Sequence, residues 1–242
     1  MSERAVPDWL TRHTFAHRGL HSFGIPENSR AAMEAAIAGG FGIECDIQMS
    51  RDHVPMVFHD WELERLTSDR GKVAARRAEE LCQLALGETG QKLWTLAQLL
   101  ELVDGKVPIL IEVKSLPHFA IQEACTAIAK VIGDYFGPLA VMSFDPRMGE
   151  WFAKQAPQYT RGLVCTDTLD HGWKHAWRQP HALERAQPDF LACDIRDLPN
   201  AICGLWREAD KPLLTWTVRT PELRAKALAH ADGLIAEGDG IA

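Results

Sequence analysis

The chain has 242 residues, of which 46% are hydrophobic and 24% are charged, and its formal net charge at pH 7 is −7. This composition is typical of a globular protein with a substantial core, and α/β barrels often reach this length as one domain. The acidic balance argues against nucleic acid or an anionic membrane surface as the main partner, because both require a basic face. An anionic ligand would have to be held by a few local cations or by a metal.

The compartment is also constrained by the sequence. Residues 1–13 contain no apolar stretch of the kind found in signal peptides, and no run approaches the length of a membrane span. The six cysteines are scattered without a C-x-x-C pair, and most lie in apolar runs where cysteine behaves as a small buried hydrophobe. These features predict a cytoplasmic protein without stable membrane insertion.

Short apolar runs alternate with helical patterns along almost the whole chain. The helical stretches include residues 29–40, which end in a glycine pair, and residues 221–231, which begin with proline. Strands that alternate with helices predict a parallel sheet, and the absence of repeats and linkers predicts a single domain over residues 1–242. In chain order, the expected strands are residues 14–18, 42–47, 55–60, 108–114, 139–145, 161–165, 190–195, 212–218 and 232–237.

The second and third of these strands are too close in sequence to be parallel, because a parallel crossover needs about a dozen residues or more. We predict an antiparallel hairpin with its turn at residues 51–52, which places Glu44 opposite His59. In this register one face of the hairpin carries Glu44, Asp46, Val57 and His59. Without the hairpin arm eight strands remain, and they predict a closed TIM (β/α)8 barrel.

Residues 61–94 do not follow this rhythm. They are polar and helix-prone, and the regular helical pattern returns only at residues 95–103. We interpret this segment as a small insertion beside the mouth of the barrel.

Charged and polar residues gather where the predicted strands end, which is where TIM barrels carry their active sites. Glu44, Asp46 and Glu112 could converge on a hard cation, since Mg²⁺ and Ca²⁺ prefer oxygen ligands. Arg18 and Lys114, together with the imidazoles of His17 and His59, would suit a phosphate ester. The full set at the strand ends is His17, Arg18, Glu44, Asp46, Glu112, Lys114, Asp145, Asp194, Trp216 and Arg219.

Each of these residues also has a structural interpretation. His17 could be a hydrogen-bonded structural histidine, Glu44 and Asp46 could decorate a solvated strand face, and Lys114 could form a simple ion pair. The functional interpretation is favoured because the residues end successive strands inside otherwise apolar runs. Burying that many charges without a role would be costly.

Seven short motifs are spread along the chain: HRG (17–19), PENS (26–29), E-C-D (44–46), V-F-H-D (57–60), I-E-V-K (111–114), TWTV (215–218) and ADGLIAE (231–237). Through these motifs the chain resembles the glycerophosphodiester phosphodiesterases, of the bacterial cytosolic type. The resemblance implies a TIM barrel with an insertion after the H-D motif. It also implies hydrolysis of a small glycerophosphodiester to sn-glycerol 3-phosphate and an alcohol.

The resemblance also implies roles for individual residues. His17 and His59 would be the general acid and base, in an order that the motifs leave open, and a glycerol hydroxyl would attack phosphorus to give a cyclic phosphate. The PENS segment would shape a turn and cap the following helix with Asn28 or Ser29. The remaining roles are Glu44, Asp46 and Glu112 as ligands of one divalent cation (Mg²⁺ or Ca²⁺), Arg18 and Lys114 as phosphate contacts, and Trp216 as a wall of the glycerol pocket.

Three positions depart from the family pattern. Ser29 replaces threonine, Arg219 replaces asparagine, and Glu237 replaces aspartate. None is a predicted metal ligand or histidine, so they bear on substrate choice more than on chemistry. Arg219 would favour a leaving group with extra negative charge, or would simply be a solvated loop residue.

Several alternatives stay open. One is a lysophospholipase D-like enzyme on the same barrel, and another is a barrel that binds phosphate ligands without catalysis. In the 166–181 loop, His171 and His175 have a spacing that can bind zinc, and Trp173 and Trp177 could rim the barrel mouth or pack on outer helices. The leaving alcohol, the cation and the choice between monomer and homodimer are not fixed by the sequence.

Overall fold

The structure, a computed structural model, describes residues 6–167, 178 and 181–241. Within these ranges eight parallel strands close into a barrel, because β1 pairs with β9 on one side and with β2 on the other. The predicted TIM-barrel fold is therefore confirmed. The barrel strands are β1 (Thr14–Ala16), β2 (Gly42–Met49), β4 (Ile109–Val113), β5 (Leu139–Ser143), β6 (Thr160–Cys165), β7 (Phe190–Asp194), β8 (Leu213–Val218) and β9 (Gly233–Ala236).

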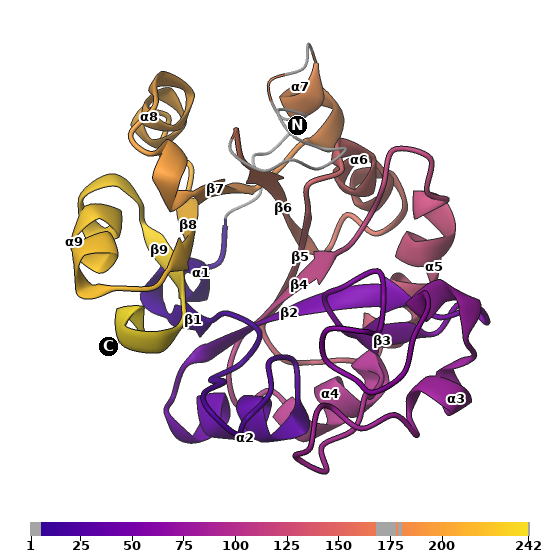
Figure 1. The fold of residues 1–242 in the computed structure, drawn as a ribbon. Coiled ribbons are helices and arrows are strands. Elements are labelled where there is room, and N and C mark those ends of the chain that lie inside the picture. Colours follow the sequence, from indigo (N-terminus) through magenta and orange to yellow (C-terminus); the bar gives the residue numbers. More distant parts are fainter. Residues whose placement is uncertain (1–5, 168–177, 179–180, 242) are drawn as a thin grey trace.

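Helices surround the ring of strands (Figure 1). Most connect one barrel strand to the next, as the alternation in the sequence predicts. None of the helices in the described part of the chain is long and apolar enough to cross a membrane. The helices are α1 (Trp9–Arg12), α2 (Arg30–Ala38), α3 (Ala78–Leu81), α4 (Leu96–Val103), α5 (Ile121–Ile132), α6 (Pro146–Gln155), α7 (Ala182–Ala186), α8 (Ala201–Glu208) and α9 (Pro221–His230).

The core has an inner and an outer layer. Inside the barrel, side chains from alternating strand positions pack together, and Leu10 of α1 joins them beside Phe15. Outside the barrel, larger clusters fill the space between strands and helices. Five of the six cysteines are buried and all six are free, so they pack as small apolar side chains.

The helix starts follow local capping rules. The Oγ atom of Ser29 accepts a hydrogen bond from the backbone N–H of Ala32 at 3.1 Å, so Ser29 and not Asn28 caps α2. Thr95 and Gln98 form a capping box at the start of α4, and Thr220 caps α9 directly before Pro221. The helices predicted over residues 29–40, 95–103 and 221–231 are confirmed.

The hairpin arm exists, but its predicted register is wrong by one residue. Strand β3 (Pro55–Val57) is antiparallel to β2 and places Val57 opposite Ile47, so Val57 does not share the face of Glu44 and Asp46. Strand β3 also ends before His59, which therefore has no strand partner opposite Glu44.

The register differs because the turn has three residues and not two. The backbone N–H of Ser50 bonds to the carbonyl of Val54 at 3.1 Å, and His53 adopts a left-handed conformation with φ 59°. This is the geometry of a three-residue hairpin loop, a tight turn followed by a left-handed residue. One additional loop residue shifts every later pairing by one position.

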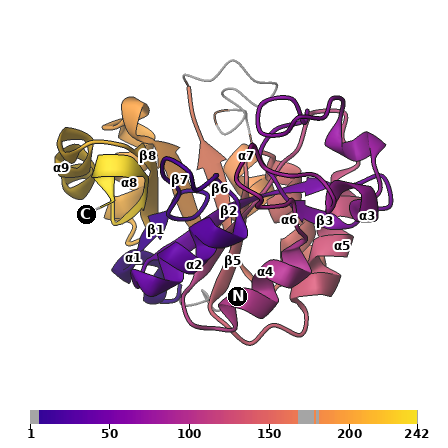
Figure 2. The same ribbon diagram turned by 60° about the horizontal axis from the view of Figure 1, so that its bottom comes forward.

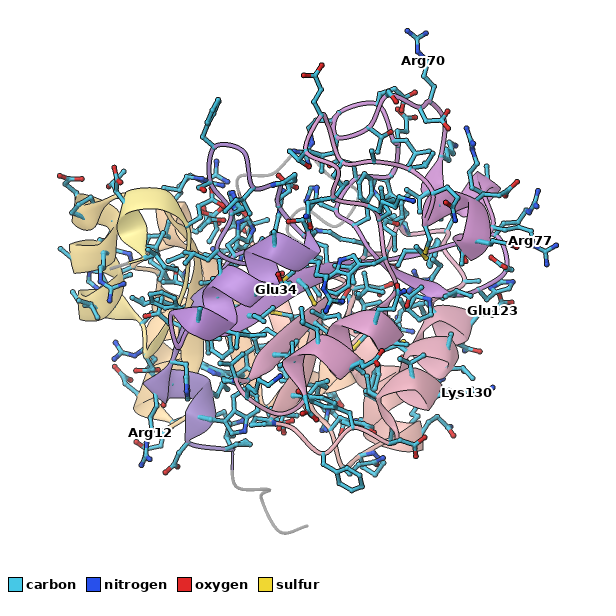
Figure 3. All side chains as sticks on the ribbon, turned by 90° about the horizontal axis from the view of Figure 1, so that it is seen from below. Arg12, Glu34, Arg70, Arg77, Glu123 and Lys130 are labelled. Atoms are coloured by element: carbon cyan, nitrogen blue, oxygen red, sulfur yellow. The ribbon has the colours of Figure 1, made fainter. Side chains whose placement is uncertain are left out.

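The segment from residue 61 to 94 interrupts the βα rhythm as predicted. It has a small apolar cluster of its own, in which Leu63, Val73 and Leu81 pack with Phe58 from the end of the hairpin arm. In Figure 2 the segment lies above α4 and α5, on the same side of the barrel as the loop that follows β1. Figure 3 shows Arg70 and Arg77 of this segment pointing outward, away from the barrel.

Candidate active site

A pocket of about 820 Å³ opens at the carboxyl ends of the barrel strands. Its wall contains seven of the eight predicted site residues: His17, Arg18, Glu44, His59, Glu112, Lys114 and Trp216. The eighth, Asp46, is buried beside them in contact with Arg18 and Lys114. All eight residues are therefore brought together in one place.

Three carboxylates form the buried base of the site. Glu44 and Asp46 project from β2 with the predicted i, i+2 spacing, and Glu112 of β4 is the direct register partner of Asp46. One oxygen from each of the three lies within 4.8 Å of the others. All three residues are at most 8% exposed. Such a set of close, hard oxygen donors could hold a hard cation.

Two cations partly neutralise these carboxylates. The Nζ atom of Lys114 lies 2.8 Å from an Asp46 oxygen and 2.6 Å from a Glu112 oxygen, and Arg18 Nε lies 3.2 Å from Asp46. Burial raises the pKa of Asp46, but the surrounding cations outweigh it and hold the pKa well below its usual range. Asp46 is therefore ionised at neutral pH.

Glu44 behaves differently. Burial, together with the nearby charges of Asp46 and Glu112, raises its pKa well above the usual range, although the backbone N–H of Arg18 donates to it at 2.9 Å. Three carboxylates against two cations leave one negative charge in excess. A divalent cation fits this set, because it would remove the repulsion that otherwise favours protonation of Glu44.

Asn28 orients Asp46, a role that the sequence did not reveal. Its side-chain Nδ2 donates to an Asp46 carboxylate oxygen at 2.9 Å, and its side-chain Oδ1 accepts from the Asp46 backbone N–H at 3.3 Å. Asn28 has a left-handed backbone with φ 55°, and its backbone carbonyl accepts from Trp94 Nε1 at 2.8 Å. The PENS motif marked the position, but capping alone would have explained it.

His17 follows directly after β1. Its Nδ1 atom is hydrogen-bonded to the Glu237 carboxylate, which follows β9, and its backbone N–H bonds to the carbonyl of Ala236 at 2.8 Å. The same carboxylate also contacts His21 Nε2 at 3.3 Å and Arg219 Nε at 2.6 Å. Burial lowers the pKa of His17 more than its hydrogen bond to Glu237 raises it.

His59 is held by a matching contact. Its Nδ1 atom lies 2.6 Å from Asp60 Oδ1, and its backbone carbonyl accepts a hydrogen bond from Gln48 at 3.0 Å. Asp60 in turn accepts from Arg65. Each histidine thus has a carboxylate on Nδ1, which fixes the tautomer and leaves Nε2 available to a ligand.

Trp216 is positioned by its indole N–H, which donates to the carbonyl of Ala192 at 2.9 Å. Its ring packs edge to face against Phe144, with 5.5 Å between the centroids. Both rings line the pocket, so they offer an apolar wall next to the charged base.

Of the other strand-end residues, Asp194 lines the pocket, whereas Asp145 is fully buried, caps α6 and is not part of the pocket wall. Arg219 lines the pocket and pairs with Glu237, and its side chain is 56% exposed. His171, His175, Trp173 and Trp177 lie outside the described residues, as does most of the 166–181 loop.

A closed parallel barrel with histidines, cations and a carboxylate cluster at the carboxyl ends of its strands has the arrangement of TIM-barrel enzymes. Residues 17–237 match the profile described as "Glycerophosphoryl diester phosphodiesterase family". The chain therefore belongs to this family of phosphoric diester hydrolases.

Relatives agree with this assignment. A glycerophosphodiester phosphodiesterase of Caldanaerobacter subterraneus subsp. tengcongensis is 29% identical over 236 residues, 92% of each chain. A probable glycerophosphodiester phosphodiesterase 2 of Mycobacterium tuberculosis is 35% identical over 241 residues, covering 93% of this chain and 87% of the relative.

The fold is also that of solved structures. An Oleispira antarctica phosphodiesterase, solved with the product sn-glycerol-3-phosphate, superimposes with a TM-score of 0.81 at 23% identity, covering 93% of this chain and 92% of that one. A glycerophosphodiester phosphodiesterase from Thermotoga maritima gives 0.75 at 24% identity, with 94% of both chains covered.

Proposed function

We propose that the chain hydrolyses small glycerophosphodiesters to sn-glycerol 3-phosphate and an alcohol, with a divalent cation and with His17 and His59 as proton-transfer groups. The observation that carries the proposal is the convergence of two carboxylate-bound histidines on one pocket, above a buried cluster of three acids. The product bound in the Oleispira antarctica relative is the one expected here.

Glu44, Asp46 and Glu112 would hold the cation, with Mg²⁺ and Ca²⁺ as the two candidates. When bound, such an ion supplies positive charge that stabilises the charge developing on phosphoryl oxygens.

Arg18 and Lys114 would contact the phosphate. Arg18 Nε is buried, and within the described residues it makes no hydrogen bond of good geometry, although it lies 3.2 Å from Asp46. A buried donor in this situation is suited to an oxygen supplied by a ligand. Trp216 and Phe144 would then bound the glycerol carbons.

The histidines would act through Nε2. His17, whose pKa is lowered chiefly by burial, would be neutral and take the proton from a glycerol hydroxyl as that oxygen bonds to phosphorus. His59 would give a proton to the departing alcohol oxygen as its bond to phosphorus breaks. Water would then open the cyclic phosphate with the two roles reversed. Attack from within the substrate gains from high effective molarity.

The test is release of sn-glycerol 3-phosphate from glycerophosphocholine and glycerophosphoethanolamine, after removal of metal and after addition of Mg²⁺ or Ca²⁺. We expect activity only with added cation. Release without cation, from protein shown to be metal-free, would contradict the metal requirement. No release with either cation would favour a barrel that only binds phosphate ligands.

Lysophosphatidylcholine is the comparison substrate. The pocket wall has apolar residues beside the charged base, including Trp61, Leu116 and Leu223, so length of the leaving group has to be tested directly. If the lipid is cleaved and glycerophosphocholine is not, the chain is a lysophospholipase D-like enzyme and our substrate choice is wrong.

We further propose that residues 1–242 act as one domain in the cytoplasm, as a monomer or homodimer. The six free cysteines support a reducing compartment. Fractionation of cells and light scattering of the purified protein test these points.

A further inference from the structure

Arg65 belongs to the insertion and forms four hydrogen bonds with two carboxylates. It donates to Asp60 through Nε at 2.5 Å and through one terminal nitrogen at 3.1 Å. It donates to Glu27 through both terminal nitrogens, at 2.9 and 2.7 Å. Four of the five guanidinium N–H donors are thus directed at protein carboxylates, although Arg65 lines the pocket. Little of its donor capacity is left for a phosphate.

Each of these carboxylates holds a residue of the candidate active site. Asp60 bonds to Nδ1 of His59 at 2.6 Å, and Glu27 accepts from a terminal nitrogen of Arg18 at 2.7 Å. A continuous chain of contacts therefore runs from His59 to Arg18, and Arg65 is its central link. It joins the loop after β1, the end of the hairpin arm and the insertion.

The charges explain why a guanidinium is needed between them. Burial raises the pKa of Glu27, but its hydrogen bonds and ion pairs with Arg65 and Arg18 hold the pKa below its usual range. The pKa of Asp60 is lowered in the same way, against the effect of burial, by His59 and Arg65. Both are anions, with side chains 13% and 22% exposed. Without Arg65 they would repel each other, and Asp60 would be drawn toward solvent and away from His59.

We infer that Arg65 is a positioning residue, which orients His59 through Asp60 and Arg18 through Glu27. The catalytic part of this inference rests on the proposed function, whereas the structural part does not. A planar guanidinium can bind two carboxylates in a forked geometry, and the ammonium of lysine cannot.

The kinetic test compares Arg65→Ala with Arg77→Ala. Arg77 belongs to the same insertion and faces the Asp52 carboxylate at 3.6 Å, but it points outward and does not line the pocket (Figure 3). We expect kcat/KM to fall by about 10- to 100-fold in Arg65→Ala, the range seen when a side chain that orients a metal ligand is lost. Arg77→Ala should match the wild type. Arg65→Lys should recover little of the loss, and added guanidinium ion should restore activity in Arg65→Ala alone.

The structural test uses the Nδ1 proton of His59, observed by ¹H NMR and assigned by its absence in His59→Gln. The hydrogen bond to Asp60 should protect this proton from exchange in the wild type and in Arg77→Ala, and the signal should disappear in Arg65→Ala. Combining Arg65→Ala with Asp60→Asn should cost less than the two separate losses added together.

Two results would overturn the inference. One is an Arg65→Ala variant with wild-type kcat/KM and an unchanged His59 signal. The other is full additivity with Asp60→Asn. If the wild type cleaves no glycerophosphodiester while the His59 signal still depends on Arg65, the proposed function fails and the positioning role stands.

Discussion

The two histidines of the pocket have the same immediate contact in different surroundings. His17 is 11% exposed and is held between β1 and β9, so its partner Glu237 is fixed by the barrel itself. His59 is 30% exposed, and its partner Asp60 is held by Arg65 of the insertion. One imidazole is thus tuned by burial inside a rigid sheet. The other depends on loop contacts that include Arg65 of the insertion.

The largest expected effect comes from deleting either imidazole. If both transfer protons, His17→Ala and His59→Ala should each lower kcat by about 10²- to 10⁴-fold, because general acid–base groups contribute that much to rate. Metal affinity should change little, which isothermal titration can check. Wild-type turnover in His59→Ala would restrict proton transfer to the buried side of the pocket.

Glu44→Gln tests the buried carboxylate cluster that lies beneath both histidines. Removal of one charged ligand should weaken cation binding by more than about 100-fold, the upper end of what outer-sphere substitutions cost. Excess Mg²⁺ or Ca²⁺ should then restore part of the activity, unlike in the histidine variants. A metal titration of activity decides, and unchanged cation affinity would remove Glu44 from the ligand set.

Glu237→Gln sharpens the comparison through pH. Burial lowers the pKa of His17 most, and the charge of Arg18 lowers it as well. The carboxylates of Glu237 and Asp46 act in the opposite direction and raise this pKa. Neutralisation of Glu237 should therefore lower the pKa of His17 further. If neutral His17 accepts the proton, the acidic limb of kcat/KM should move to lower pH.

The profile must be measured at saturating cation, because metal binding itself weakens in acid. His21 and Arg219 also face Glu237, so each is replaced singly as a control. An acidic limb that moves to higher pH in Glu237→Gln would contradict the assignment of that limb to His17.

The smallest effect is expected from Arg219→Ala. Its side chain is 56% exposed, and ion pairs of exposed groups contribute at most about 1 kcal/mol. We expect kcat/KM to change only several-fold and the melting temperature to change little. A loss as large as that of Arg65→Ala would show that both histidine partners need an arginine behind them.

The strands and the carboxylate cluster could be predicted because they depend on local pattern. Apolar runs identified the nine strands found in the described part of the chain, and the i, i+2 spacing of Glu44 and Asp46 placed both on one face. The family motifs then identified His17 and His59 as candidate site residues, and both line the pocket. Each of these patterns spans only a few residues, so it can be recognised without knowledge of the tertiary structure.

The partners of these residues could not be predicted in the same way. Glu237 is 220 positions from His17, and Arg65 is 38 positions from Glu27, so no local pattern links them. The hairpin register failed for a related reason. The loop length depends on the left-handed conformation of His53, and a histidine in the sequence does not predict this conformation as a glycine would.

The contact between His17 and Glu237 has a consequence for how the protein is made. It joins the ends of the first and last barrel strands. While the chain is being synthesised and β9 has not yet left the ribosome, the His17 imidazole therefore lacks the Glu237 carboxylate. The backbone bond from His17 to Ala236 is missing at that stage as well. Assembly of this part of the candidate active site is therefore tied to barrel closure, and an unfinished chain lacks the contact.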